Sequence, residues 1–74
     1  MAMIFDYDKE ADAAFLYFAN KKPVPGDEAR SEPADIDVEN AAVILLYDKN
    51  DRLLGFEFLG ASRLFEPAVL RASR

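Results

Sequence analysis

Four acidic side chains near the start of the chain stand two positions apart and could together hold a divalent cation. They are Asp6, Asp8, Glu10 and Asp12. An EF-hand loop beginning at Asp6 would need glycine at its sixth position and glutamate at its twelfth, where this chain has Ala11 and Tyr17. The EF-hand interpretation therefore fails. A looser divalent-ion or small-ligand site on this acidic turn stays open, beside a solvated turn in which Asp8 or Asp12 accepts backbone N–H groups.

A further carboxylate, Glu57, stands among apolar residues of a predicted strand. Alternation places Leu54, Phe56 and Phe58 on one strand face. It places Glu57 on the opposite face, with Gly55. Such a carboxylate could work as an acid or base, pair with a base across the sheet, or point to solvent. Hydrolysis by paired carboxylates needs two acids about 5 to 9.5 Å apart across a cleft. Nothing in so short a chain implies a cleft.

The residue types that the chain lacks exclude most other chemistry. It has no cysteine and no histidine, so disulfides, thiol nucleophiles, imidazole relays and the usual zinc sites are excluded. No serine stands in a Gly-x-Ser-x-Gly elbow, and the three glycines do not cluster into a phosphate-binding loop. We therefore expect no enzyme, and no catalytic, cofactor-binding or metal-binding residue.

Length and charge bound the class of protein. Seventy-four residues predict a single domain over 1–74. Fourteen acidic against nine basic residues give a net charge of -5, which argues against nucleic-acid binding. The longest apolar run, residues 13–19, is shorter than the roughly 20 residues of a membrane span. We see no signal peptide and expect no membrane association and a cytoplasmic location.

The hydrophobic pattern predicts the elements that carry these residues. Strands are expected where aromatic or β-branched residues alternate or run together, at residues 3–8, 13–19, 41–47 and 53–59. Residues 9–19 could alternatively form one helix. A strand within 27–35 would lie at a sheet edge because of Pro33. Pro67 is expected to begin a short helix that ends near Ser73. This helix should pack on the sheet through Val69 and Leu70, together with the preceding Leu64 and Phe65. The fold class is thus α+β: a mainly antiparallel β-meander of about four to five strands with a short C-terminal helix.

Two segments of the chain repeat one pattern. Tyr7-Asp8-Lys9 precedes a strand with Phe15 and Tyr17, and Tyr47-Asp48-Lys49 precedes a strand with Phe56 and Phe58. We interpret them as two similar hairpins, each a strand, a Tyr-Asp-Lys turn and a strand, although acidic turns between apolar strands can also look alike by chance.

These two segments resemble the two signatures of the DUF2283 family. Residues 7–13 and the strand 15–17 resemble its opening YDPEADALYI pattern, and residues 43–62, VILLYDKNDRLLGFEFLGAS, resemble its second signature. Lys9 stands where the family often has proline, and Asp51-Arg52 where it often has Gly-Arg. The resemblance implies a small, mainly β domain of unknown function with no established activity. Some relatives look like partners of small toxin-like proteins. The residues matching the signatures, for which structural roles are expected, are Tyr7, Asp8, Glu10, Asp12, Tyr47, Asp48 and Glu57.

Apolar side chains lie on both faces of two predicted strands, at residues 13–19 and 41–47. One short helix can cover only part of one face, so the remainder needs a curled sheet or a partner. We expect a protein-interaction and self-association module: a homodimer or small homo-oligomer, with a small basic protein as a further, antitoxin-like partner. The candidate interface residues are Phe15, Tyr17, Phe56, Phe58 and Phe65.

Overall fold

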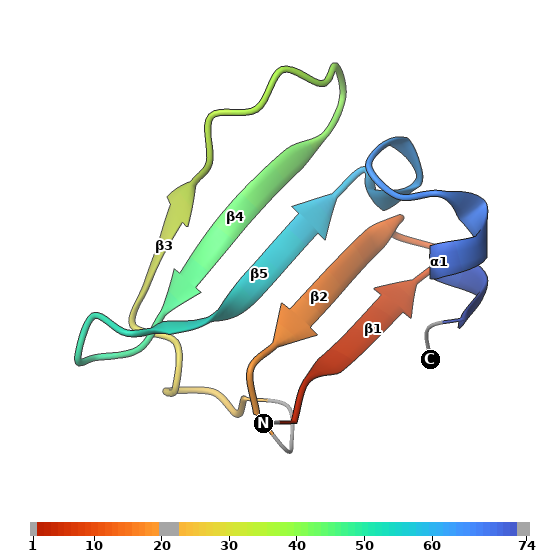
Figure 1. Cartoon of the computed structure of the whole chain (residues 1–74). Helices are drawn as coiled ribbons and strands as arrows, with labels where there is room; N and C mark the ends of the chain where they lie inside the picture. The colour runs from red at the N-terminus through yellow and green to blue at the C-terminus, as the bar shows by residue number, and fades with distance from the viewer. Residues whose placement is uncertain (1, 20–22, 73–74) are drawn as a thin grey trace.

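The computed structural model describes residues 2–19 and 23–72. Five strands, a 3-10 turn and one helix follow one another along the chain (Figure 1). They are β1 (Ile4–Asp8), β2 (Ala13–Tyr17), β3 (Arg30–Pro33), β4 (Ala42–Tyr47), β5 (Leu53–Leu59), η1 (Ala61–Arg63) and α1 (Pro67–Ala72). The predicted α+β class is confirmed. Residues 13–17 form a strand, so the single helix over residues 9–19 is wrong.

The strands form one antiparallel sheet in the order β1-β2-β5-β4-β3. The last three strands follow one another as a meander, and the β1–β2 hairpin joins them because β2 pairs with β5. β3 lies at a sheet edge, as Pro33 predicts. The two similar hairpins are confirmed as β1–β2 and β4–β5, and their second strands form the centre of the sheet.

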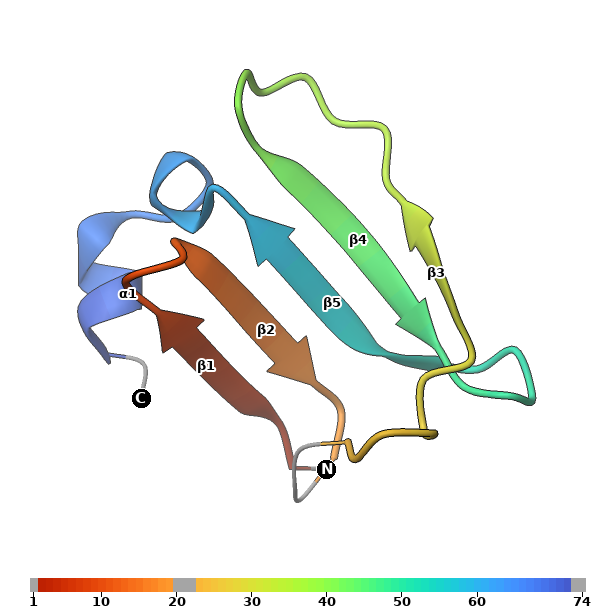
Figure 2. The ribbon, with the colours of Figure 1, turned by 180° about the vertical axis from the view of Figure 1, so that it is seen from behind.

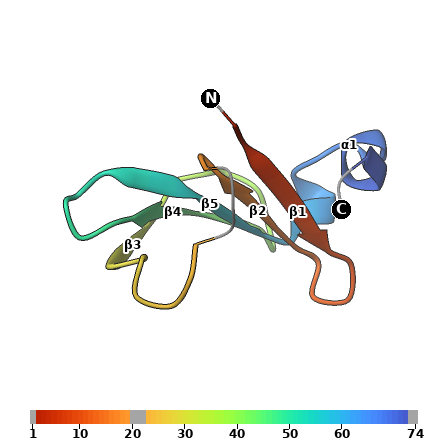
Figure 3. The ribbon, with the colours of Figure 1, turned by 90° about the horizontal axis from the view of Figure 1, so that it is seen from below.

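Cross-strand pairing assigns each side chain to one of two sheet faces, because directly paired residues project to the same side. We call the first the helix face; across β1, β2, β5 and β4 its two rows are Phe5–Leu16–Phe56–Leu45 and Tyr7–Ala14–Phe58–Val43, and Glu32 of β3 continues the first row beside Leu45. We call the second the loop face; its rows are Ile4–Tyr17–Gly55–Leu46, Asp6–Phe15–Glu57–Ile44 and Asp8–Ala13–Leu59–Ala42. The view along the sheet in Figure 3 places α1 and the loop before β3 on opposite sides.

The C-terminal segment covers part of the helix face through Phe65. Its ring meets Phe5 and Phe58 edge to face, with centroids 5.3 Å and 4.8 Å away. α1 itself lies beside β1, at one end of the sheet, in both face-on views (Figures 1 and 2). Val69 is 43% exposed, so the predicted packing of α1 through Val69 is wrong; the short helix turns that side chain to solvent. The predicted helix end near Ser73 lies outside the described residues.

A bulge in the β4–β5 pair corrects another prediction. Leu46 pairs with Gly55 but Tyr47 pairs with Leu53, so Leu54 is an extra residue in β5. Leu54 lines a pocket together with Glu57, and the expected alignment of Leu54 with Phe56 and Phe58 is wrong. Gly55 is required beside the bulge, because a Cβ atom there would collide with the backbone oxygen of Leu16.

The core of this sheet is small. The buried apolar residues in the described part of the chain are Ala13, Ala14, Leu46 and Ala61. No large side chain is fully buried there. The aromatic rings therefore pack against one another but remain partly exposed to solvent.

Candidate functional site

The acidic turn between β1 and β2 uses its carboxylates to hold backbone. Asp8 accepts hydrogen bonds from the N–H groups of Glu10 at 3.1 Å and Ala11 at 3.4 Å. Asp12 adopts the left-handed conformation, with φ 52°, which aspartate tolerates better than most residues. Glu10 is exposed in the turn. The alternating acids thus lie in a tight turn and a strand end rather than around a common centre.

Asp12 joins the two ends of the signature region. Its carboxylate accepts the Tyr7 hydroxyl at 2.8 Å, the Ser62 N–H at 2.9 Å and the Ser62 hydroxyl at 2.7 Å. Its carbonyl oxygen also accepts the N–H of Ala61 at 2.9 Å. We call this group of Tyr7, Asp12 and Ser62 the Asp12 clasp. It fixes η1 to the β1–β2 turn and so directs the chain from β5 back across the helix face.

The electrostatics of the Asp12 clasp suit a structural role. Hydrogen bonds from Ser62 and then from Tyr7 lower the pKa of Asp12 below its ordinary value. The same bond to Asp12 raises the pKa of the Tyr7 phenol. A carboxylate of lowered pKa is a weak base. The lowered pKa keeps Asp12 in its charged form, in which its carboxylate accepts hydrogen bonds from both Tyr7 and Ser62.

The second acidic turn, between β4 and β5, repeats the role of Asp8. Asp48 accepts the N–H groups of Asn50 at 2.8 Å and Arg52 at 3.0 Å. These bonds, that from Arg52 first, lower the pKa of Asp48. Tyr47 lies under the Arg30 guanidinium, whose central carbon is 4.1 Å from the ring centroid. Most of the seven signature residues thus lie in turns or in contact with neighbouring side chains.

Glu57 differs from Asp8, Asp12 and Asp48, whose carboxylates accept backbone N–H groups. It lies half-buried in the middle of β5, between Phe15 of β2 and Ile44 of β4. No described residue makes a hydrogen bond or an ion pair with its carboxylate. A charged group in this position is solvated only from the loop side of the sheet.

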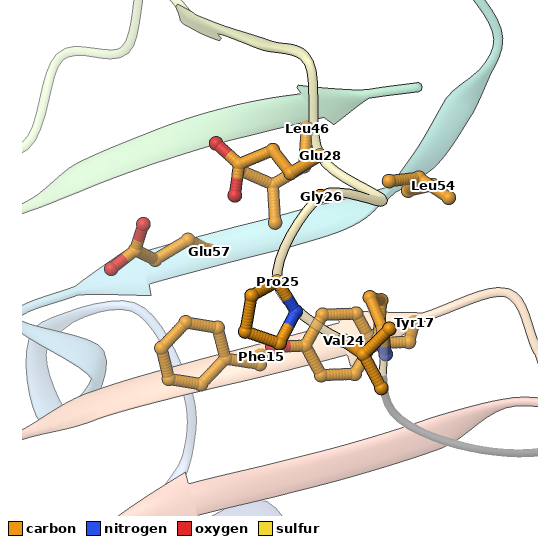
Figure 4. A pocket seen from close by; sticks show the side chains of 10 residues that line it. Phe15, Tyr17, Val24, Pro25, Gly26, Glu28, Leu46, Leu54 and Glu57 are labelled. Carbon is orange, nitrogen blue, oxygen red and sulfur yellow. The ribbon is translucent and has the colours of Figure 1, made fainter. Parts of the chain in front are cut away.

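Glu57 faces a pocket of about 400 Å³ between the loop face and the loop before β3. Figure 4 shows Phe15 and Tyr17 on one side, with Glu57 and Glu28 on the other. The remaining lining residues are Pro23, Val24, Pro25, Gly26, Leu46 and Leu54. The Phe15 and Tyr17 rings are stacked with centroids 5.9 Å apart. The pocket therefore combines aromatic surface with two carboxylates.

The five candidate interface residues do not form one surface. Phe56, Phe58 and Phe65 pack together on the helix face, whereas Phe15 and Tyr17 lie on the loop face. Within the described ranges 2–19 and 23–72, no three acidic residues gather closely enough to suggest a metal site. In the same ranges, no helix has the length and apolarity needed to cross a membrane.

Sequence reasoning missed two contributors to these sites. The sequence points to Ser62 only as a hydroxyl group, whereas its N–H and its hydroxyl both donate to the Asp12 carboxylate and the preceding Ala61 N–H donates to the Asp12 carbonyl oxygen. Glu28 and the loop from Pro23 carry no local pattern that predicts their place in the lining of the pocket that contains Phe15. Only the proline and glycine content marked this segment as a loop.

A comparison with known protein families finds one match, which covers the strands and the Asp12 clasp. The model of the family described as "Protein of unknown function (DUF2283)" matches residues 4–62. The match begins in β1 and ends at Ser62, so it contains the whole Asp12 clasp and leaves Phe65 and α1 outside. No curated protein and no solved structure matches the chain. Since the match spans most of its length, this chain belongs to the DUF2283 family.

Proposed function

We propose that this protein is a self-association module whose helix face pairs with the helix face of a second copy. The supporting observation is the surface of the single chain, 5423 Å². A compact monomer of this mass exposes about 4,600 Å². The excess of roughly 800 Å² equals what each partner buries in a standard protein–protein interface.

The helix face suits this pairing better than the loop face. Across β1, β2, β5 and β4, the two rows of the helix face contain no carboxylate and no basic side chain. Among the described strands, charge appears on this face only at its β3 edge, where Glu32 pairs with Leu45 and forms an ion pair with Arg30. The loop face carries Asp6, Asp8 and Glu57 in its rows. Interface cores are depleted of charged residues and enriched in aromatic ones. The side of the helix face away from α1, around Val43 and Leu45, is the part that a second copy would cover.

Light scattering after size exclusion tests the pairing. We expect a mass of about 17 kDa for the wild type at roughly 100 µM, twice that of one chain. Leu45→Lys places a charge on the helix face and is expected to give monomers. Ile44→Lys is the matched control, because Ile44 is the preceding strand residue and projects to the loop face.

Two results would contradict this proposal. One is a wild type that elutes as a monomer at that concentration. The other is an equal loss of pairing in Leu45→Lys and Ile44→Lys. Should Leu45→Lys fail to fold by circular dichroism, Val43→Lys on the same face replaces it.

A second candidate function, covering a small basic protein in the manner of an antitoxin, draws its support from charge. The net charge of -5 would attract a basic partner and speed its association. Both Glu57 and Asp6 lie on the face that the proposed dimer leaves open. A partner held there would leave the dimer intact, so the two functions are compatible.

A further inference from the structure

An exposed guanidinium group on the surface of this protein shows which chemistry the fold uses to hold an organic cation. Arg30 lies over the Tyr47 ring at 4.1 Å. Its nitrogens reach Glu32 at 3.0 Å and Asp51 at 3.2 Å. An aromatic face and two carboxylates thus surround one cationic side chain, an arrangement in which ring quadrupole and ion pairs add to each other.

The pocket on the loop face presents the same set of groups to solvent. It offers the stacked rings of Phe15 and Tyr17 together with the carboxylates of Glu28 and Glu57. No lysine or arginine is among its described lining residues. Glu57 in particular has no ion-pair partner in the described part of the chain. The pocket therefore has the groups that bind a cation, but no described residue places a cationic side chain in it.

The apolar part of the lining defines the shape of that cation. Val24, Pro25, Leu46 and Leu54 line the pocket together with the two rings. A hydrated metal ion would gain little from such walls, because hard cations need several oxygen ligands. A guanidinium or ammonium group on a short alkyl chain would place its charge between the glutamates and its methylene groups against the rings and prolines.

We propose that the pocket formed by Phe15, Tyr17, Glu28, Glu57 and the Val24–Pro25 loop segment binds an alkyl guanidinium or alkyl ammonium group. Such a group belongs either to a free organic amine or to an arginine or lysine side chain of a basic protein. The site lies on the face opposite the proposed dimer interface, so it does not depend on self-association.

A nuclear magnetic resonance titration of the full chain with butylguanidinium tests the site. Butylurea is the control probe, because it has nearly the same shape without the charge. We expect butylguanidinium to shift the backbone amides of Phe15, Gly26 and Glu57 saturably, and butylurea to bind at least about tenfold more weakly. Equal shifts by the two probes, or shifts spread evenly over the acidic surface, would overturn the proposal.

Glu57→Gln tests the carboxylate with almost no change of shape. We expect it to weaken butylguanidinium binding at least about fivefold. Glu39→Gln removes the same charge from an exposed position away from the pocket lining and should leave the affinity within about twofold. Equal affinities of Glu57→Gln and wild type would refute the site. Glu28→Gln, in the exposed loop, repeats the test should Glu57→Gln fail to fold.

Two further arms complete the design. Lys21 and Lys22 lie outside the described residues, so the wild-type titration is repeated in K21A/K22A; the proposal requires the same amides to shift there.

A tripeptide with one central arginine, capped at both ends, then distinguishes the source of the cation. Tighter binding than that of butylguanidinium assigns the site to a protein side chain, and weaker binding assigns it to a free amine. Neither result depends on the dimer, whose failure would appear only in the mass measurement.

Discussion

At the residue scale, Asp12 joins the first turn of the sheet to the segment that follows β5. Its carboxylate accepts three hydrogen bonds from Tyr7 and Ser62. Its backbone takes the left-handed conformation that ends the first turn, with φ 52°. The aspartate at this position of the DUF2283 signature thus connects two segments that are 50 residues apart in the sequence.

The lowered pKa of Asp12 predicts the direction of a pH effect on stability. A carboxyl group with a lowered pKa in the folded state stabilises the fold above the unfolded pKa, about 3.9. That contribution is lost as pH falls through the lowered folded value. We expect the urea midpoint of the wild type to decrease as the solution is acidified below pH 4 or so, with Asp48 adding to the effect in the same direction.

Variants separate Asp12 from the other acids. Asp12→Asn tolerates the left-handed conformation but loses the charge, so it should be less stable than wild type at pH 7 and change less on acidification. Glu10→Gln, exposed in the same turn, is the control and should follow the wild-type curve. Parallel curves for wild type and Asp12→Asn would show that the clasp does not contribute to acid sensitivity.

The raised pKa of Tyr7 acts at the other end of the pH scale. A phenol with a raised folded pKa stabilises the fold below its unfolded pKa, about 10, and loses that contribution as pH rises through the folded value. The Asp12 clasp is therefore expected to be complete between these two limits, which include neutral pH.

At the scale of elements, Phe65 connects the C-terminal segment to the sheet. Its ring contacts Phe5 and Phe58, whereas Val69 of α1 is 43% exposed. We expect Phe65→Ala to lower the free energy of unfolding by about 2 kcal/mol, less than for a fully buried ring. Val69→Ala should change it by less than about 0.5 kcal/mol. Chemical denaturation measures both, and equal effects would show that α1 packs through its own side chains.

The elements also show how far sequence reasoning reached. Alternation and acidic turns predicted β1, β2, β4 and β5, because a half-buried strand and an aspartate turn each have local signals. For β3, which is exposed and polar, the sequence indicated only that a strand within 27–35 would lie at an edge. The pairing of β2 with β5 had no such signal, since alternation assigns faces but not neighbours. Leu54 was misplaced because a bulge adds one residue and reverses the alternation around it. Val69 was misplaced because a helix of six residues shows too little periodicity to define its buried side.

Some residues of the candidate sites could be predicted from local sequence patterns, and others could not. Asp8 and Asp48 were predictable because each bonds backbone within four residues of itself. The bond from Ser62 to Asp12 and the position of Glu28 near Glu57 both depend on the folded path of the chain. No local pattern contains that path.

At the scale of the whole molecule, the small core leads to a prediction about concentration. The buried apolar residues of the described chain are mostly alanines, and domains of this size have little stability to spare. If folding and pairing are coupled through the helix face, dilution should unfold the protein. We expect the melting temperature to rise by several degrees over a hundredfold increase in protein concentration, and Leu45→Lys to show no rise. A constant melting temperature in the wild type would separate folding from pairing.

The pairing of β2 with β5 sets the order in which the chain can fold. Each hairpin closes over a short turn, which takes on the order of microseconds. Ala13 and Leu59 are far apart in sequence yet directly paired, so the two hairpins must meet by a slower, long-range search. The bond between Asp12 and Ser62 closes only after that encounter. Substitutions in the clasp should therefore speed unfolding and leave the refolding rate almost unchanged, so that the clasp acts as a latch that sets the lifetime of the native state.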